Sequence, residues 1–237
     1  MVHSIVAVNA HPDDELSCLG TLAKCRRRGD QVTLVAVSRA EKGGGFDLTI
    51  PDEEVAAIRQ REASRVAEAL GATYVCLGAD DGFIQDQPDL RTMLVQLFRR
   101  VSVDIVLTAP PTDYSLDHIT TGQIATQAAL LAAVAPIRRD ESALDRPPAV
   151  FYMDTITGLD FQPWVYVDIT KQFERKCELL RMHESQMMSQ PRFAGWDLVA
   201  HAEIVGRFRG LQAGVAYAEG FRPVLRNPLI RPGPLLP

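Results

Sequence analysis

The stretch that decides the fold is SIVAVNAHPDDE, residues 4–15. Its first half, residues 4–9, is a short apolar run, which indicates a buried β-strand. Directly after that strand, one imidazole and two carboxylates fall within four residues, at His11, Asp13 and Asp14. Removing such a cluster from water is costly unless a cation or hydrogen bonds compensate. The sequence therefore favours a buried strand that ends in a polar site, although one aspartate could instead merely cap the next helix.

Short apolar runs and longer segments of helical period alternate along the rest of the chain. The predicted strands are residues 4–9, 31–37, 73–77, 104–108, 150–153 and 164–168, and the predicted helices are residues 16–28, 52–70, 89–101, 118–135, 171–186 and 198–211. Asp52 can cap the second of these helices and Gly71 can end it. This alternation is typical of a parallel sheet with helices on both faces. We therefore predict an α/β fold, with a Rossmann-like, mostly parallel sheet covered by helices on both faces.

The chain contains neither an internal repeat nor a recognisable linker in its 237 residues. That length is ordinary for a single α/β unit. We therefore predict one domain over residues 1–237. The Pro-rich end, about residues 222–237, predicts an extended tail or an arm at an interface, and a homo-oligomer is one expectation that follows.

The composition excludes several classes of protein. The formal net charge is −5 and no stripe of Lys and Arg offsets it, which argues against a nucleic-acid partner. No apolar run approaches the roughly 20 residues of a membrane span, and the N-terminus lacks the features of a signal peptide. The four cysteines form no CxxC pair, so reduced thiols are the simple explanation. We expect a cytoplasmic protein with a small-molecule partner.

A second polar segment, DYSLDH at residues 113–118, directly follows the predicted strand at residues 104–108. In sheets of this type ligands bind beyond the carboxyl ends of the strands, so both polar segments should lie on one rim. Together they would supply His11, Asp14 and His118, a set of two imidazoles and one carboxylate with open positions for water. Taken alone, His118 is equally a surface histidine at a helix start. Zinc suits such a set well, but iron or manganese could also occupy it.

A strand followed by AHPDDE, with a later DH-xxx-G, resembles the LmbE/PIG-L family of N-acetylglucosaminyl-type deacetylases. Proteins of this family remove acetyl groups from N-acetylglucosaminyl lipids, from mycothiol and bacillithiol precursors and from some antibiotics. The resemblance covers nearly the whole chain, and its further matches are Arg59-x-x-Glu62, Leu70-Gly71, Asp80-Asp81-Gly82, YVDIT at residues 166–170, Lys176, His183-x-Ser185-Gln186, Arg209-Gly210, Tyr217-Ala218-Glu219 and Phe221. The AHPDDE run is the specific signal, whereas the later matches are individually weak.

The resemblance implies that His11, Asp14 and His118 bind zinc, or another divalent metal, and that Asp13 is the general base. This agrees with the chemistry of the residues, because adjacent carboxylates can point apart, one to the metal and the other to its water. Asp13 would accept a proton from the water that attacks the amide carbonyl and then donate it to the leaving amine. Asp117 would accept a hydrogen bond from a ligand imidazole and orient it, or would equally serve as a helix N-cap.

The sequence departs from the family pattern where many relatives read His-Pro-Asp-His. This chain reads Ser-Leu-Asp-His at residues 115–118. The first histidine of that pattern is thought to help stabilise the oxyanion, whereas Ser115 can donate a hydrogen bond but cannot carry positive charge. Tyr114 or His183 could substitute, the metal could supply the help alone, or the preferred substrate could differ.

Further substrate-binding residues are implied by the resemblance, each with a simpler alternative. Arg59 matches the family arginine that contacts substrate, or is an exposed helix residue paired with an acidic neighbour. Asp81 matches an acidic residue that binds sugar hydroxyls, or is a turn residue. Glu41 could line the same pocket or be a solvated loop charge, and His183 could equally be a core or capping histidine. Residues 43–51 are interpreted as a mobile lid.

The leading hypothesis is a zinc-dependent N-deacetylase that acts on an N-acylated amino sugar or its glycoside. One alternative is an amidase that cleaves a larger acyl group or a thiol conjugate. Another is a metal-binding protein without catalysis, which only Ser115 supports. Asp13 counts against this last alternative, since a mere binder gains little from a second carboxylate beside its metal.

Overall fold

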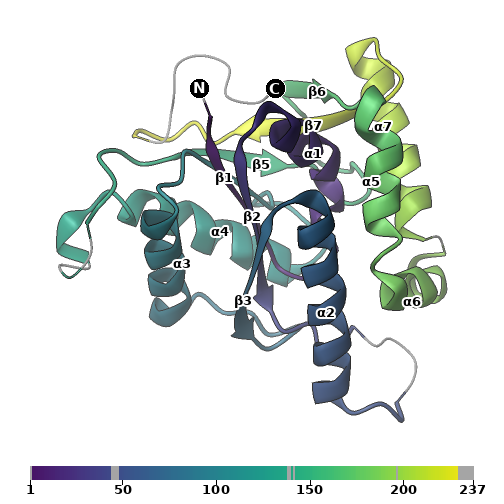
Figure 1. Ribbon diagram of the computed structural model, residues 1–237, viewed down its shortest axis with the longest axis horizontal. Coiled ribbons are helices and arrows are strands. Elements are labelled where there is room, and N and C mark those ends of the chain that lie inside the picture. Colours follow the sequence, from purple (N-terminus) through teal and green to yellow (C-terminus); the bar gives the residue numbers. More distant parts are fainter. Residues whose placement is uncertain (1, 44–47, 138–139, 141, 196, 229–237) are drawn as a thin grey trace.

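The computed structural model describes residues 2–43, 48–137, 140, 142–195 and 197–228. A seven-stranded sheet lies at its centre, in the order β3-β2-β1-β4-β5-β7-β6 (Figure 1). The strands are β1 (Ser4–Asn9), β2 (Gln31–Ser38), β3 (Thr73–Ala79), β4 (Ile105–Thr108), β5 (Ala149–Met153), β6 (Val165–Asp168) and β7 (Ala218–Pro223). The pairs from β3 to β5 are parallel, and β7 pairs antiparallel with both β5 and β6. The predicted mostly parallel sheet is therefore confirmed.

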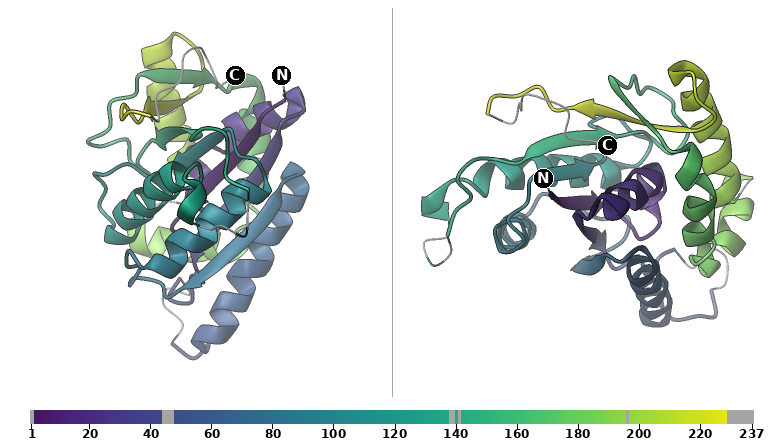
Figure 2. Two further views of the ribbon diagram at one scale, coloured as in Figure 1. Left: turned by 90° about the vertical axis from the view of Figure 1, so that its left-hand side faces the viewer. Right: turned by 45° about the horizontal axis from the view of Figure 1, so that its top comes forward.

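Helices cover both faces of this sheet. They are α1 (Leu19–Arg28), α2 (Asp52–Leu70), α3 (Pro88–Arg100), α4 (Leu116–Leu131), α5 (Phe173–Leu180), α6 (Glu184–Ala194) and α7 (Leu198–Ala213), with short 3-10 turns η1 (Asp14–Ser17), η2 (Ala135–Ile137) and η3 (Thr170–Gln172). Figure 1 and the right-hand view of Figure 2 separate α3 and α4 from the group of α5, α6 and α7, in which α7 contacts both α5 and α6. Among the described residues, none of these helices combines the length and the apolar character that crossing a membrane requires.

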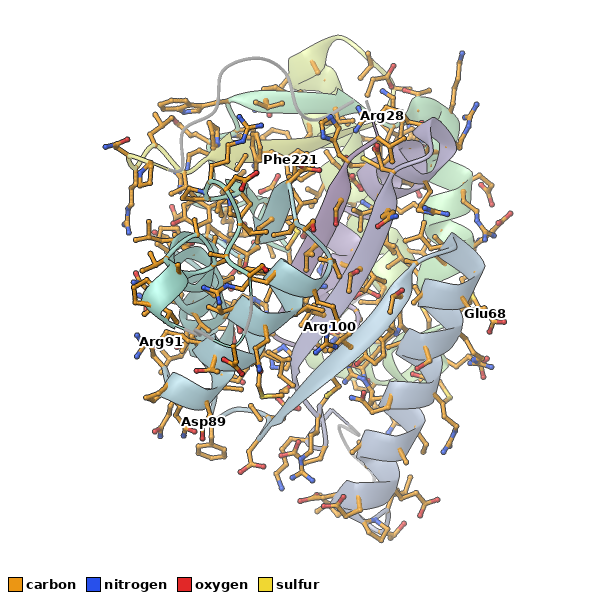
Figure 3. The ribbon with its side chains drawn as sticks, turned by 60° about the vertical axis from the view of Figure 1, so that its left-hand side comes forward. Arg28, Glu68, Asp89, Arg91, Arg100 and Phe221 are labelled. Atoms are coloured by element: carbon orange, nitrogen blue, oxygen red, sulfur yellow. The ribbon has the colours of Figure 1, made fainter. Side chains whose placement is uncertain are left out.

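The central strand β1 is buried on both faces, as its continuous apolar sequence predicts. Ile5 and Ala7 belong to the core beneath α1, α2, α5 and α7, whereas Val6 and Val8 belong to the core beneath α3 and α4. Figure 3 shows how buried and exposed side chains differ in direction: Phe221 of β7 lies inside the molecule, whereas Glu68 of α2 points outward. Since side chains alternate along a strand, β1 is the layer that both cores share.

Three expectations about individual elements need correction or comment. The helix predicted over residues 171–186 is broken, because His183 leaves helical geometry (φ −81°, ψ 61°) and becomes the N-cap of α6. Asp52 does not cap α2, since Pro51 occupies the N-cap position with the extended backbone that a proline ring favours. The predicted tail begins inside β7, and its last residues, 229–237, lie outside the described residues, as do residues 44–47 of the predicted lid.

The order of the strands places the polar segments at one rim. From β1 the chain continues outward to β2 and β3, whereas β4 and β5 lie on the other side of β1. Ligands of open α/β sheets bind at such a reversal, beyond the carboxyl ends of the strands. The turn η1 follows β1 at this point and α4 follows β4, so the two polar segments meet where a site is expected.

Candidate metal centre and active site

Three side chains from two loops converge beyond β1 and β4. His11 lies in the loop between β1 and η1, Asp14 is the first residue of η1, and His118 lies in the first turn of α4. The two oxygens of Asp14 lie 3.4 Å from Nδ1 of His11 and 3.3 Å from Nε2 of His118, and the donor atoms of all three lie within 4.8 Å of one another. Two imidazole nitrogens and one carboxylate oxygen around a common point are a donor set that a divalent metal such as zinc accepts. The residues therefore fit a metal.

The charges of this group favour a cation. Burial alone would raise the pKa of the Asp14 carboxyl, but the neighbouring charges of His118 and His11 hold it well below its usual value. Burial alone would lower the pKa of His118, but the Asp14 charge and a hydrogen bond to Asp113 raise it to about 10. Asp14 is thus ionised, as a metal ligand must be, whereas both imidazoles have to release a proton before they can bind a metal.

A carboxylate also holds the other nitrogen of each imidazole. Nδ1 of His118 lies 3.0 Å from Oδ1 of Asp113. Nε2 of His11 lies 3.3 Å from Oδ2 of Asp117 and 3.0 Å from Oδ1 of Asp81. Such partners fix the orientation and the tautomer of a ligand imidazole and raise its basicity. The sequence analysis gave Asp113 no role. Its position in the same polar segment as His118 could have indicated that it holds this imidazole.

Asp117 is held firmly in place by backbone amides. It is 4% exposed and accepts hydrogen bonds from the amides of Gly82 (2.7 Å) and Ile84 (3.1 Å). The N-cap of α4 is Ser115, so Asp117 lies in the first turn and the alternative that it caps this helix is wrong. Its carboxylate ties the loop after β3 to the side chain of His11.

Asp13 lies beside His11, Asp14 and His118, which we call the metal group, but its carboxylate points to Arg59. It is 7% exposed, and its Oδ1 lies 3.0 Å from Nη2 of Arg59. Burial raises the pKa of Asp13 to about 6, although the Arg59 charge opposes that rise. A carboxylate whose pKa lies near neutrality can both accept and donate a proton. The two adjacent carboxylates of Asp13 and Asp14 thus face different partners.

A buried pair of residues lies behind Asp13. Oε2 of Glu15 accepts from the amide of Asp13 (2.9 Å), and Oε1 of Glu15 lies 2.8 Å from Nε2 of His183. Glu15 is 2% exposed and His183 is fully buried. Its burial places His183 away from the cleft, in the core position that was its simpler alternative. The sequence analysis gave Glu15 no role. Its position as the third acidic residue directly after a buried strand could have indicated one.

His11 and Asp14 line a cleft of about 570 Å³, whereas His118 is not among the described residues that line it. That volume lies in the usual range for small-molecule sites. The predicted residues that line it are His11, Asp13, Asp14, Arg59, Asp81 and Tyr114, and further lining residues are Leu16, Lys42, Gly43, Ile156, Thr157, Gln186, Ser189, Gln190, Leu198 and His201. Half of this second group comes from α6 and α7, and of these residues only Gln186 belongs to a motif quoted from the sequence.

Arg59 and Asp81 both contact the polar floor of the cleft. Arg59 is 3% exposed and donates to the Pro12 carbonyl as well as to Asp13, so the alternative of an exposed helix residue is wrong. Asp81 contacts His11 through Oδ1 and accepts from the Lys42 amide through Oδ2, at 3.2 Å. Each of the two is therefore close enough to the metal group to contact a molecule bound there.

The other predicted binding residues differ in their access to the cleft. Tyr114 is 70% exposed, lines the cleft and packs edge-on against His118, with ring centroids 5.3 Å apart. Ser115 donates its amide to Asp113. Glu41 is 3% exposed rather than solvated, and accepts from a backbone amide through one oxygen. Neither Ser115 nor Glu41 is among the described residues that line the cleft.

Comparison with known proteins gives two kinds of relative. A family model described as PIG-L, GlcNAc-PI de-N-acetylase, matches residues 6–129. A curated relative, a 4-oxalmesaconate hydratase of Pseudomonas putida, is 24% identical and covers 93% of this chain and 89% of its own.

Solved structures show the same division. The N,N′-diacetylchitobiose deacetylase of Pyrococcus horikoshii superposes with a TM-score of 0.82 at 24% identity, over 94% of this chain and 84% of that one. A 4-carboxy-2-hydroxymuconate hydratase of Pseudomonas putida superposes with a TM-score of 0.84 at 23% identity, over 98% and 100% of the two chains. These similarities establish a shared fold. The two proteins with that fold are named for different reactions, one as a deacetylase and the other as a hydratase.

Proposed function

The chain belongs to the PIG-L family, described as GlcNAc-PI de-N-acetylase, and on that premise we propose that it is a metal-dependent hydrolase that removes an N-acetyl group from an amino-sugar-containing small molecule. One arrangement carries this proposal. Asp13, a buried carboxylate whose pKa is raised to about 6, lies beside the donor set of His11, Asp14 and His118, and His11, Asp13 and Asp14 line the cleft. A donor set for a metal with a spare base next to it is one arrangement that can hydrolyse an amide.

His11, Asp14 and His118 would hold the metal, with zinc as the first expectation for two imidazoles and one carboxylate. When bound, the ion would polarise the amide carbonyl and lower the pKa of a water molecule. Asp113 and Asp117 would keep the two imidazoles in the orientation and tautomer that present one nitrogen to the ion.

Asp13 would move the proton. It would accept a proton from the water as the water oxygen forms its bond to the carbonyl carbon. It would then deliver that proton to the nitrogen as the C–N bond breaks, which leaves acetate and a free amine. Arg59, 3.0 Å from Oδ1 of Asp13, would favour the ionised form of the base before each cycle.

The lining of the cleft fits a polar substrate with several hydroxyl groups. The Asp81 carboxylate can accept hydrogen bonds from sugar hydroxyls, and Lys42 and Gln186 add polar groups to the same cleft. Since Ser115 is not among the described lining residues, it is a poor candidate for the oxyanion role. The Tyr114 hydroxyl is the better candidate, because Tyr114 lines the cleft next to His118 and a phenol can donate a hydrogen bond.

The direct experiment measures acetate release from a panel of N-acetylated amino sugars and their glycosides by the zinc-loaded protein. Asp13→Asn should retain zinc but lose activity by a factor on the order of 10²–10⁴, the contribution typical of a general base. Asp89→Asn makes the same chemical change on an exposed residue of α3 and should leave the activity unchanged. Absence of acetate from every substrate would refute the deacetylase proposal, and an Asp13→Asn protein as fast as wild type would refute the base.

Acyl groups of different size test the related alternative of an amidase. The same panel, prepared with butanoyl and benzoyl amides in place of acetyl, would show faster turnover of the larger groups if the protein is an amidase. A protein that binds zinc tightly and hydrolyses none of these amides would instead support the non-catalytic alternative.

The two similar hydratases favour a second candidate, the addition of water to an unsaturated carboxylate. The same Asp13 could take the proton of the attacking water, and the cationic side chains of Arg59 and Lys42 at the cleft could pair with a substrate carboxylate. Incubation with 4-oxalmesaconate, followed by ultraviolet absorbance, tests this candidate separately. Loss of the absorbance of the conjugated double bond without acetate release from the sugars would favour the hydratase.

A further inference from the structure

The backbone of Asp13 lies in a region that residues other than glycine rarely occupy. Its φ is 99° and its ψ is −21°, which is left-handed geometry. Such a conformation persists only where the surroundings over-determine it, and it is found preferentially at functional sites. The neighbouring contacts that hold Asp13 therefore decide where its carboxylate points.

Glu15 supplies the contact to the backbone of Asp13. One carboxylate oxygen, Oε2, accepts from the Asp13 amide at 2.9 Å, and the other, Oε1, lies 2.8 Å from Nε2 of His183. Glu15 is 2% exposed, and a carboxylate so far from water needs a hydrogen-bonding partner for each oxygen. His183 is that second partner, and its contact prevents rotation of the Glu15 carboxylate away from Asp13.

The break between α5 and α6 is what brings His183 to this point. His183 lies at the N-cap of α6, where the chain leaves helical geometry, and its side chain is fully buried. The next turn binds α2 as well, since the amide and Oγ of Ser185 donate to the two oxygens of Glu62 at 2.9 and 2.7 Å. Glu62 lies one turn after Arg59, the residue that contacts the Asp13 carboxylate. The 183–185 segment thus contacts both Glu15, which accepts from the Asp13 amide, and α2, the helix that carries Arg59.

We propose that Glu15 and His183 are positioning residues, which hold Asp13 in its left-handed conformation and so aim its carboxylate at the reacting water. The inference rests on the proposed role of Asp13 as the base. Neither residue touches the substrate, since neither is among the described residues that line the cleft. Their effect on the reaction passes through the Asp13 backbone.

Crystal structures of zinc-loaded variants test the proposal without any substrate. Glu15→Leu removes the acceptor for the Asp13 amide at similar volume, whereas Glu15→Gln keeps an acceptor oxygen there. In Glu15→Leu the φ of Asp13 should leave the left-handed region and its carboxylate should lose the 3.0 Å contact with Arg59. In Glu15→Gln both features should stay as in the wild type. If Glu15→Leu does not fold, His183→Leu takes its place and should show the same shift to a smaller extent.

Kinetics on whichever panel substrate is hydrolysed separate positioning from general destabilisation. Glu15→Leu should lower kcat by a factor on the order of 10², as expected for a misplaced catalytic group, with KM and zinc content unchanged. Glu15→Gln should restore most of kcat. The control Asp30→Asn removes a buried carboxylate at the amino ends of β1 and β2, opposite the rim that carries the site. It should lower the melting temperature without changing kcat.

Several results would overturn the inference. It fails if Asp13 keeps its φ and its contact with Arg59 in both Glu15→Leu and His183→Leu, whether or not a substrate is known. It also fails if Glu15→Gln displaces Asp13 as far as Glu15→Leu does, or if Asp30→Asn loses kcat to the same extent. By contrast, failure of the panel to release acetate would contradict the proposed function and leave the crystallographic result to decide the positioning.

Discussion

At the scale of single residues, the chemistry of the site depends on carboxylates that do not themselves face the cleft. Asp113 shows this most simply, because its Oδ1 lies 3.0 Å from Nδ1 of His118 and its side chain is 2% exposed. Replacement by alanine removes the acceptor that fixes the imidazole. We expect Asp113→Ala to weaken zinc affinity by about 10–100-fold, and Asp113→Asn, which keeps an acceptor oxygen, to weaken it less.

Competition with a chromophoric chelator measures that affinity directly. Asp86→Ala, on an exposed carboxylate that pairs with Arg91 rather than with a histidine of the site, is the control and should bind zinc as the wild type does. Equal zinc affinity in Asp113→Ala and wild type would show that His118 needs no such partner.

The sequence predicts some residues of the site far better than others, for physical reasons. His11 and Asp14 were predictable because a charged cluster directly after a buried strand favours a polar site, whereas His118 was predictable only once both polar segments were placed on one rim of the sheet. Arg59 was ambiguous, since an arginine on a helix is usually exposed, and only the fold reveals that it is buried against Asp13. His183 was ambiguous for the opposite reason, because nothing in the local sequence shows which carboxylate it meets across the molecule.

At the scale of elements, a buried carboxylate at the start of β2 ties three segments together. Asp30 is fully buried, accepts from the amide of His3 at 2.9 Å and pairs with Arg28 at 2.6 Å. Burial alone would raise the pKa of Asp30, but the hydrogen bonds from Arg28 and His3 outweigh burial and lower it. A carboxyl whose pKa is lower in the folded state stabilises the fold above its unfolded pKa, and this stabilisation is lost as the pH falls through the folded pKa.

Asp30→Asn should therefore lower the free energy of unfolding by about 1–3 kcal/mol at neutral pH, because a charge-assisted hydrogen bond is lost in the core. The difference from wild type should stay constant down to about pH 5 and shrink below about pH 4, the usual range of an aspartate. Urea unfolding at several pH values measures both trends. A difference that grows towards acid pH would contradict the assignment.

The close approach of α4 to the loop after β4 at Gly122 leads to a second prediction at this scale. A Cβ atom on Gly122 would lie 2.2 Å from the carbonyl oxygen of Ala109, so α4 would have to move. Gly122→Ala should cost about 1–3 kcal/mol of stability, as overpacking does, and should weaken zinc binding because His118 lies on the same helix. The control is Gly206→Ala in α7, where the nearest atom to a new Cβ is 3.4 Å away.

Gly206→Ala should be neutral or slightly stabilising, since alanine is the better helix former. Thermal unfolding and the zinc competition assay compare the two variants. If Gly122→Ala proves as stable as Gly206→Ala and binds zinc normally, α4 does not depend on this contact.

The elements themselves were predictable where local patterns determine them. The strands β1 to β6 and most helices follow from apolar period, because each must bury one stripe or both faces, whereas β7 was not predicted. The break before α6 was not predictable, since residues 171–186 contain neither glycine nor proline, and the contact of His183 with Glu15 joins residues far apart in the sequence. The predicted cap of α2 was wrong, because Pro51 and not Asp52 occupies the N-cap position.

At the scale of the whole molecule, the alternation of strands and helices predicts a parallel sheet but not the order of its strands. The reversal beside β1 and the antiparallel β7 both arise from long-range pairing, which local patterns do not encode. The same limit applies to the wall of the cleft around α6 and α7, whose residues reach the site only through the folded chain. Motif and fold together therefore predict the floor of the site, and the walls, which select a substrate, require the structure.

The most direct test of the account is a crystal structure of the zinc-loaded protein, with anomalous diffraction collected at the zinc edge. We expect one peak, bound at about 2.0–2.2 Å by Asp14 and by the nitrogens of His11 and His118 that face it, with Asp13 close by but unbound. A second group of potential ligands, His11, Asp81 and Asp117, also lies within 4.8 Å and offers the alternative position. A zinc peak in that second group, or ligation by Asp13, would contradict the account.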